Sequence, residues 1–416
     1  MSSSQALVRL GENRDLYYTD EKNCVKQSIP VTVDTRFRQD FSNKSTGVSV
    51  FTIPPVNGLR HVLIVIGYKA ASINGQLGAR ALERGWGYRA LSQVSFRVGG
   101  SSQYFLTSQQ LLARNLRLVR TQSQADAILS LGGNECKTAA DFDVDQYAYI
   151  PVTIWASPSE DDLGVPLPSD ILQQQVQITA ELAPASAFWS APLVGGPADV
   201  APPTSFDTAY FQIEQLQMKD RGMALSSRVD MATHMYSMPL PTFDQQEFVL
   251  PIGAGGTSTP VVLSGFRAGQ VKKIQIWMTK TSDVANPLRW YAPKSVQLLY
   301  AGQVFANFEE GSSAIWNLLD GTKPAAVNQS ALAPSGTSPN VVWSSTPVLS
   351  SYVELPLAQP SGSDYATDVL VHGMEITNGI ANLTITPPDA SAYELHVVYV
   401  YNCTLGFSRG SAELIF

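Results

Sequence analysis

Apolar and polar residues alternate with a period of two along much of the chain, as expected for β-strands with one buried face. The clearest case lies near the C-terminus, where one face of a long segment is apolar. That face comprises Tyr393, Leu395, Val397, Tyr399, Tyr401, Cys403, Leu405 and Phe407, and the other face includes Glu394, His396, Asn402 and Thr404. Shorter strand-like segments are 61–68, 93–98, 147–155, 271–278 and 295–305. The pattern therefore predicts a protein built mainly from β-strands.

Helical patterns are few and short. Residues 108–119 place several leucines on one stripe behind a serine that suits an N-cap, and residues 313–319 predict a second helix. The Asn378-Gly379 pair, flanked by alternating residues over 374–385, predicts a hairpin with a type I′ turn. The fold class expected from these patterns is all-β with a few short helices.

Landmarks in the first half of the chain recur in the same order in the second half. Each half has a strand that ends in lysine, a Trp/Tyr sequence, two strands around a glycine turn, a short leucine-rich helix and two further strands. The paired segments are 61–69 and 272–280 (offset 211), 86–89 and 289–291, 93–105 and 295–308, 149–154 and 352–357 (offset 203), and 209–213 and 392–396 (offset 183). The order predicts a tandem duplication.

The duplication predicts four parts. An N-terminal arm spans 1–27, a first sandwich 28–230, a connector 231–245 and a second sandwich 246–416. Each copy is long enough for an eight-stranded, two-sheet sandwich. The connector is rich in Met and Pro, which disfavours a regular helix, and the arm has mixed charge and no sustained alternation.

Composition narrows the classes of function. Charged residues make up only 15% of the chain, against roughly 25% in typical soluble domains, so much of the surface is expected to be covered in an assembly. The net charge of −7 argues against nucleic acid as a direct partner. The three cysteines, Cys24, Cys136 and Cys403, have no disulfide or zinc spacing, which suits a reducing compartment. The sequence shows no signal-peptide pattern and no apolar run of membrane-spanning length, so neither secretion nor membrane insertion is expected.

Three glycine-containing motifs match catalytic or nucleotide-binding patterns by letter only. Gly406–Gly410 fits a nucleophile elbow around Ser408, but no histidine follows it, so a turn is expected. Gly132–Thr138 lacks the glycine that precedes lysine in a phosphate-binding loop. Gly85–Ala90 resembles a dinucleotide fingerprint, but a strand is expected after it. None of the three is therefore predicted to bind a ligand.

Acidic, histidine and tryptophan side chains give no stronger signal. Asp141, Asp143 and Asp145 alternate, and a solvated strand face is favoured over a surface cation site because Gln146 and Val152 stand where a calcium loop needs its turn glycine and its ligand glutamate. The histidines (His61, His234, His372, His396) lack metal-ligand spacing, and Glu309, Glu310 and Glu354 are not a convincing acid pair. The tryptophans are expected in core or interface packing: Trp86, Trp155, Trp189, Trp277, Trp290, Trp316 and Trp343.

The tandem sandwiches, each with a strand, a glycine turn, a second strand and a short helix, resemble the double jelly-roll major capsid proteins of icosahedral double-stranded DNA viruses. That family includes adenovirus hexon and the shell proteins of nucleocytoplasmic large viruses, virophages and polinton-like viruses. Segments 93–119 and 286–320 carry the resemblance, which extends over about residues 28 to 416. It implies two tandem eight-stranded jelly-roll β-sandwiches.

The resemblance also implies a function without catalysis. Three copies would form a homotrimeric capsomer with six similar lobes, and neighbouring trimers would tile an icosahedral shell. Further partners would be penton and minor capsid proteins, with an internal membrane in some relatives, and no sequence-specific nucleic acid. The implied location is the virion capsid, assembled inside the host cell, with no cofactor, metal or catalytic residue.

Two other classes stay open on the sequence alone. A receptor- or carbohydrate-binding β-sandwich, such as a spike or fibre, would favour exposed aromatic residues at one loop end and a trimerising stalk. A jelly-roll glycan hydrolase or amidase would need a clustered pair of acids. The sequence has no stalk repeat and no evident acid pair.

Overall fold

The structure is a computed structural model of the 416-residue chain. The described residues are 24–25, 38–55, 58–98, 102–117, 122–152, 169, 174–190, 200–218, 236–240, 245–264, 270–283, 290–291, 293–308, 353–357, 374–375, 381–401, 403–408 and 411–415.

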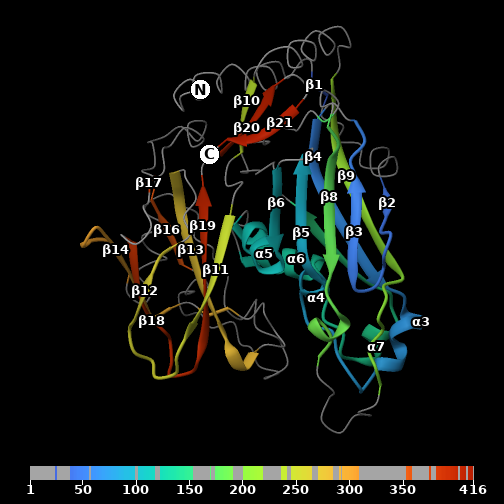
Figure 1. The fold of residues 1–416 in the computed structure, drawn as a ribbon. Helices are drawn as coiled ribbons and strands as arrows, with labels where there is room; N and C mark the ends of the chain where they lie inside the picture. The colour runs from blue at the N-terminus through green and yellow to red at the C-terminus, as the bar shows by residue number, and fades with distance from the viewer. Residues whose placement is uncertain are drawn as a thin grey trace.

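The first half forms a sandwich of two antiparallel sheets (Figure 1). In one sheet the strands follow the order β2 (Gln39–Asp40), β9 (Thr208–Met218), β4 (Gly58–Tyr68) and β7 (Gln146–Val152). In the facing sheet the order is β3 (Gly47–Thr52), β8 (Val176–Leu182), β5 (Leu91–Val98) and β6 (Ser102–Thr107). The two-residue strand β1 (Cys24–Val25) lies within the predicted arm and also pairs with β9.

The second half repeats this arrangement. One sheet has the order β11 (Gln245–Ile252), β19 (Tyr393–Tyr401), β13 (Gln270–Lys280) and β16 (Val353–Pro356), and β17 (Met374–Glu375) pairs with the start of β13. The other has the order β12 (Thr259–Val262), β18 (Ala381–Thr386), β14 (Ser295–Tyr300) and β15 (Gln303–Phe308). Strand for strand, this is the order of the first sandwich. The prediction of two eight-stranded jelly rolls is confirmed.

A shared irregularity fixes how the two copies align. The pairing of β4 with β9 shifts register between Leu59 and His61, and the pairing of β13 with β19 shifts between Val271 and Lys273. These β-bulges coincide at an offset of 212, as do the ends of the two 11-residue strands. The offset of 211 predicted from sequence was therefore wrong by one residue, and that of 183 for β9 and β19 was wrong by three, since Tyr210 corresponds to His396. Because side chains alternate between faces, an error of one residue exchanges core and outer positions.

Each sandwich has its own core between its two sheets. In the first, β7 and β8 bury every second residue, and Phe211 stacks on Phe41 and Phe51 with ring centroids 4.5 and 5.2 Å apart. In the second, residues from facing sheets, including Ile276 and Leu298, form a separate buried cluster. This is the two-layer burial that the period of two predicted.

Helices occupy the connections of the first sandwich. The predicted helix at 108–119 is α5 (Ser108–Arg117), and α6 (Gln122–Leu131), which follows it, was missed. Shorter helices of the first sandwich are α3 (Ala70–Ile73), α4 (Trp86–Arg89), α7 (Ala139–Phe142), η1 (Asn74–Gln76) and η2 (Ala185–Ala187), and η3 (Thr281–Asp283) follows β13 in the second sandwich. The predicted helix at 313–319 lies outside the described residues. None of the described helices is long and apolar enough to cross a bilayer.

Two predictions near the C-terminus were wrong. The segment 393–407 is not one strand: β19 ends at Tyr401, and β20 (Cys403–Ser408) belongs to a separate sheet between β10 (Tyr236–Leu240) and β21 (Ser411–Ile415). The hairpin at 374–385 does not form either, because β17 pairs with β13 whereas β18 pairs with β12 and β14. Strand β10 falls inside the predicted connector, so the C-terminal tail pairs with the segment between the sandwiches.

Candidate assembly surfaces

The aspartates at 141, 143 and 145 stabilise local structure and do not lie on a strand. Asp141 is the third residue of α7 and accepts hydrogen bonds from the backbone N–H groups of Thr138 (2.7 Å) and Lys137 (3.0 Å), which closes a capping box. These hydrogen bonds hold the pKa of Asp141 below its usual range. Asp143 is the C-cap of α7, and Asp145 accepts from the N–H of Ala70 at 2.9 Å. The predicted strand face was therefore wrong, because a helix cap competes successfully with extended backbone.

Two of the glycine-containing motifs are packing sites in the first core. Residues 86–89 form the buried helix α4, whose Gly87 donates its N–H to the carbonyl oxygen of Gly132 at 2.8 Å. Gly133 has a φ of +123°, and a Cβ there would lie 2.5 Å from Nε1 of Trp86. Glycine is required at these positions because two backbone segments and an indole ring approach closely. A short buried helix followed by strand β5 is not a dinucleotide-binding arrangement.

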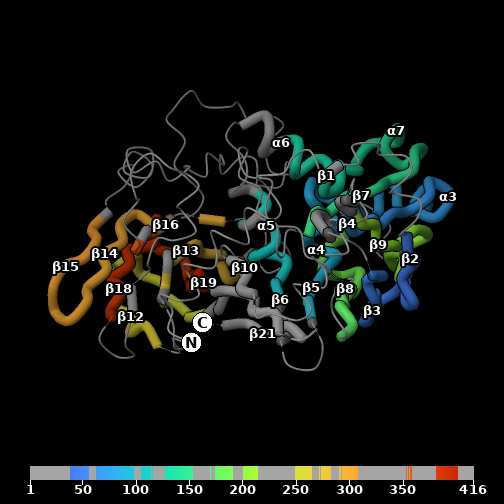
Figure 2. Tube along the Cα trace, turned by 90° about the horizontal axis from the view of Figure 1, so that it is seen from above, coloured from blue at the N-terminus to red at the C-terminus, as the bar shows by residue number. Residues whose placement is uncertain are grey.

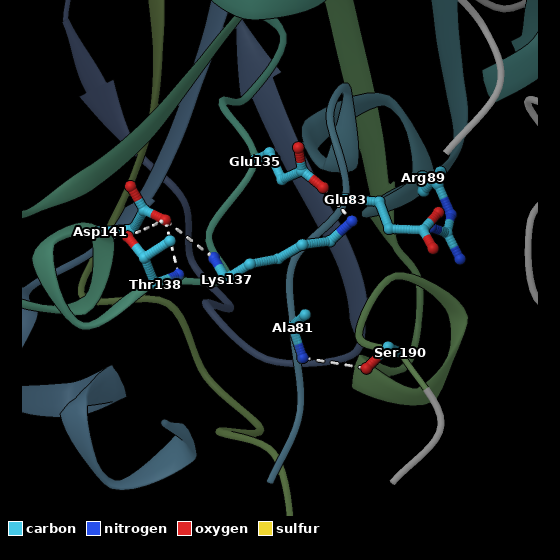
Figure 3. A network of polar contacts seen from close by, with 8 residues as sticks. All are labelled: Ala81, Glu83, Arg89, Glu135, Lys137, Thr138, Asp141 and Ser190. Atoms are coloured by element: carbon cyan, nitrogen blue, oxygen red, sulfur yellow. Dashed lines mark hydrogen bonds and ion pairs between the residues drawn. The ribbon is translucent and has the colours of Figure 1, made fainter. Parts of the chain in front are cut away.

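Figure 3 shows the polar contacts around these segments. Arg89 is nearly fully buried and pairs with Glu83 at 3.2 Å, and it also donates to the carbonyl oxygen of Ala187 at 2.9 Å. Burial lowers the pKa of Arg89, an effect that Glu83 opposes. Lys137 forms an ion pair with Glu135, two residues before it on the same segment. These contacts hold the loops at one end of the first sandwich together.

The remaining motifs and side chains do not form a cluster for chemistry. Ser408 ends β20 and is in register with Ser411 of β21, so a strand follows where a nucleophile elbow requires a helix. No group of three or more acidic, histidine or cysteine side chains suited to a metal ion occurs among the described residues. His234, His372, Glu309, Glu310, Trp155, Trp316 and Trp343 lie outside the described residues, as do the side chains of His61 and Glu354.

The buried tryptophans divide between a core and a joint. Trp86 and Trp189 belong to the first core, as expected. Trp277 and Trp290 are equally buried, yet they cluster with the first sandwich although they belong to the second. The two indoles stack with centroids 5.0 Å apart. They therefore mark a contact between the two sandwiches.

Trp277 lies at the centre of this joint. Its indole N–H donates to Oε1 of Gln109 on α5 at 2.8 Å, which links the second sandwich to the first. On the adjacent strand, the ring of His396 stacks on Trp277 with centroids 5.5 Å apart, and its Nε2 lies 2.9 Å from Oγ1 of Thr279. In both views α5 lies between the β11–β19–β13–β16 sheet and the first sandwich (Figures 1 and 2).

The joint buries a face of the sheet that would ordinarily be solvated. The inward positions of β13 and β19 pack in the second core, and their outward positions are buried as well. These outward residues are Lys273, Gln275, Trp277, Thr279, His396, Val398 and Val400. The joint is heterologous: α5, which follows β6 of the first sandwich, covers the outer β13–β19 face of the second.

Exposed apolar residues concentrate on strands at the edges of the sheets. Among the described residues, eight of the eleven exposed large hydrophobic side chains lie on such strands. They are Val48 and Val50 on β3, Phe105 on β6, Tyr149 on β7, Val249 on β11, Val262 on β12, and Val304 and Phe305 on β15. Apolar edge strands are prone to association in a lone molecule, so these surfaces suit contacts with other chains.

Comparison with known proteins places the fold. No protein-family model and no curated protein matches the chain. Solved structures do: VP54 of PBCV-1, fitted into a reconstruction of the virophage Sputnik, matches with a TM-score of 0.61 and 12% identity over 91% of this chain and 96% of that one. A chain of the PBCV-1 virus capsid matches with a TM-score of 0.60 and 11% identity over the same shares. The Faustovirus major capsid protein matches with a TM-score of 0.56 and 9% identity over 89% and 90%.

These likenesses extend over about nine-tenths of each chain and therefore include both sandwiches. Together with the repeated strand order, they confirm the double jelly-roll fold expected from the sequence. At 9–12% identity the likeness is one of fold, and function has to be argued from the surfaces described above.

Proposed function

We propose that this chain is a major capsid protein whose homotrimers are the pseudo-hexameric capsomers of an icosahedral virion shell. The observation that carries the proposal is the head-to-tail joint between two jelly rolls of identical strand order. A heterologous contact between similar units leaves one unused surface at each end. Such contacts close into a ring when the rotation per unit permits, and otherwise continue as a filament.

In a closed ring of three chains, both of these unused surfaces are covered. Three chains contribute six similar sandwiches, so the joint within each chain alternates with a similar contact between chains. The resulting tile is nearly hexagonal, and the apolar edge strands that are not used inside the trimer stay available for neighbouring tiles. The low charged fraction of 15% agrees with a surface that is largely covered after assembly.

The proposed role has no catalytic step. The candidate motifs within the described residues act as caps, turns and core packing, and the fold's solved relatives include the Faustovirus major capsid protein. Location in the virion capsid, assembly inside a host cell, and contact with penton and minor capsid proteins or an internal membrane belong to the same proposal. The N-terminal arm, residues 1–27, is assigned to contacts beneath the tile.

Size-exclusion chromatography with light scattering tests the proposal. The purified chain has a mass of 45.0 kDa, so the expected species has three times that mass. A chain lacking residues 1–23, which keeps strand β1 and its pairing with β9, is expected to keep this mass and its melting temperature, while the yield of particles falls. A wild-type chain that stays monomeric and soluble at all accessible concentrations contradicts the capsomer.

A further inference from the structure

We infer that the outer face of the β9–β4–β7 sheet, centred on a row in which Tyr149 and Tyr210 flank the fully buried Val65, is where the second sandwich of a neighbouring copy docks. The inference rests on the proposed function and deepens it by naming the contact between chains. The row follows from strand register, because Val65 pairs with Tyr149 on β7 and with Tyr210 on β9. All three residues point away from the first core.

The internal duplication identifies this row. At the offset of 212 set by the shared β-bulge, Val65 occupies the position of Trp277. Tyr210, which is in register with Val65, then occupies the position of His396, which is in register with Trp277. The Trp277–His396 pair is the surface that α5 covers inside the chain. On the equivalent surface of the first sandwich Val65 is also buried, but Tyr149 beside it is 39% exposed.

The chemistry of the row suits a protein contact. Tyr149 is 39% exposed, and its ring lies 6.4 Å from that of Tyr147 on the same face. The Arg38 guanidinium sits 3.9 Å from the centroid of the Tyr210 ring and pairs with Asp40 at 3.2 Å. Tyrosine and arginine are the residue types enriched at the energetic centres of interfaces.

A second copy is the occupant that these observations favour. Within one chain, the α5 side of a jelly roll already fits this kind of outer-sheet face. In the first sandwich, strand β6 precedes α5. Its counterpart in the second sandwich is β15, on which Val304 and Phe305 are exposed. This side of the second sandwich is therefore the counterpart of the α5 side of the first. Placing that side against the tyrosine row of the next copy repeats the internal joint around a three-fold axis.

The test compares Tyr149→Glu with Tyr149→Phe and with Leu77→Glu in the full-length protein. Leu77 is a matched control because it is an exposed apolar residue of the first sandwich (45%) that lies outside the row. Light scattering over a dilution series is expected to show that Tyr149→Glu weakens association by about 30-fold or more, since interface centres carry effects of this size. Tyr149→Phe and Leu77→Glu are expected to associate like the wild type, and all variants to melt as folded proteins.

Hydroxyl-radical footprinting of the wild-type chain provides a readout that does not depend on a variant folding. Tyr147 and Tyr149 are expected to be protected in the oligomer relative to the diluted monomer, and Leu77 to be equally reactive in both. A wild-type trimer with unprotected tyrosines, or a folded Tyr149→Glu variant that still trimerises with wild-type affinity, overturns this contact and leaves the capsomer intact. A wild-type chain that never associates overturns the capsomer itself.

Discussion

Replacing Trp277 with alanine tests the joint between the sandwiches. The side chain is fully buried, and an aromatic residue of this size removes roughly 150–250 Å² from water, worth about 4–6 kcal/mol at 25 cal/mol per Å². Measured truncations of buried Phe and Trp cost about 3–5 kcal/mol. The substitution also leaves Oε1 of Gln109 without the 2.8 Å hydrogen bond from the indole, a loss of about 1 kcal/mol. We expect Trp277→Ala to lower the free energy of unfolding by about 4 kcal/mol.

The location of Trp277 also predicts how the variant unfolds. Because the residue belongs to the joint and not to the second core, each sandwich keeps its own interior. Calorimetry is therefore expected to resolve two unfolding transitions in the variant, one for each sandwich. In the wild type the two sandwiches are expected to unfold more nearly together. The control is Val262→Ala, on an edge strand of the second sandwich and 59% exposed, which should change stability by less than about 0.5 kcal/mol. A Trp277→Ala variant as stable as this control refutes the joint.

Three further predictions concern the first sandwich. Asp141→Ala should cost about 1 kcal/mol at pH 7 through loss of the capping box. Because the pKa of Asp141 is lowered in the folded state, its contribution is present above about pH 4 and is lost as the pH falls through the lowered pKa, so the difference between the thermal melts of variant and wild type should shrink with acidification. Gly133→Ala should destabilise by about 1–3 kcal/mol in urea titrations, whereas Gly75→Ala, with open space around it, should be nearly neutral. Burial raises the pKa of Cys136 to about 12, so mass spectrometry of alkylated peptides should find it modified only after unfolding; rapid modification of the folded protein would contradict its position.

The sequence predicted the architecture because a period of two is a strong signal in strands with one buried face. Strands β4, β5, β7, β13, β14 and β19 all lie where the alternation indicated. The duplication was visible because the order of landmarks survives even though individual residues differ. The register between the two copies was not visible, because short strands align about equally well when they are shifted by one residue. The β-bulges that settle the offset are backbone features without a clear residue signature.

The surfaces were harder to predict because burial on both faces of a sheet breaks the alternation. Val398 and Val400 lie on the face of β19 that also bears His396, and Trp277 lies on the outer face of β13. These apolar residues at outward positions are the signal in the sequence for a second buried face, and the expectation of core or interface packing for Trp277 did not separate the two. The aspartates around Asp141 were misassigned for a different reason: a four-residue helix with a capping box is shorter than any periodicity can reveal.

Electron microscopy of the purified full-length protein tests the capsomer most directly. The account predicts particles of three chains with six similar lobes arranged as a nearly hexagonal tile. In these particles the joint at Trp277 inside each chain should alternate with a contact at Tyr149 between chains. Isolated two-lobed particles, or open filaments in place of closed tiles, would contradict it.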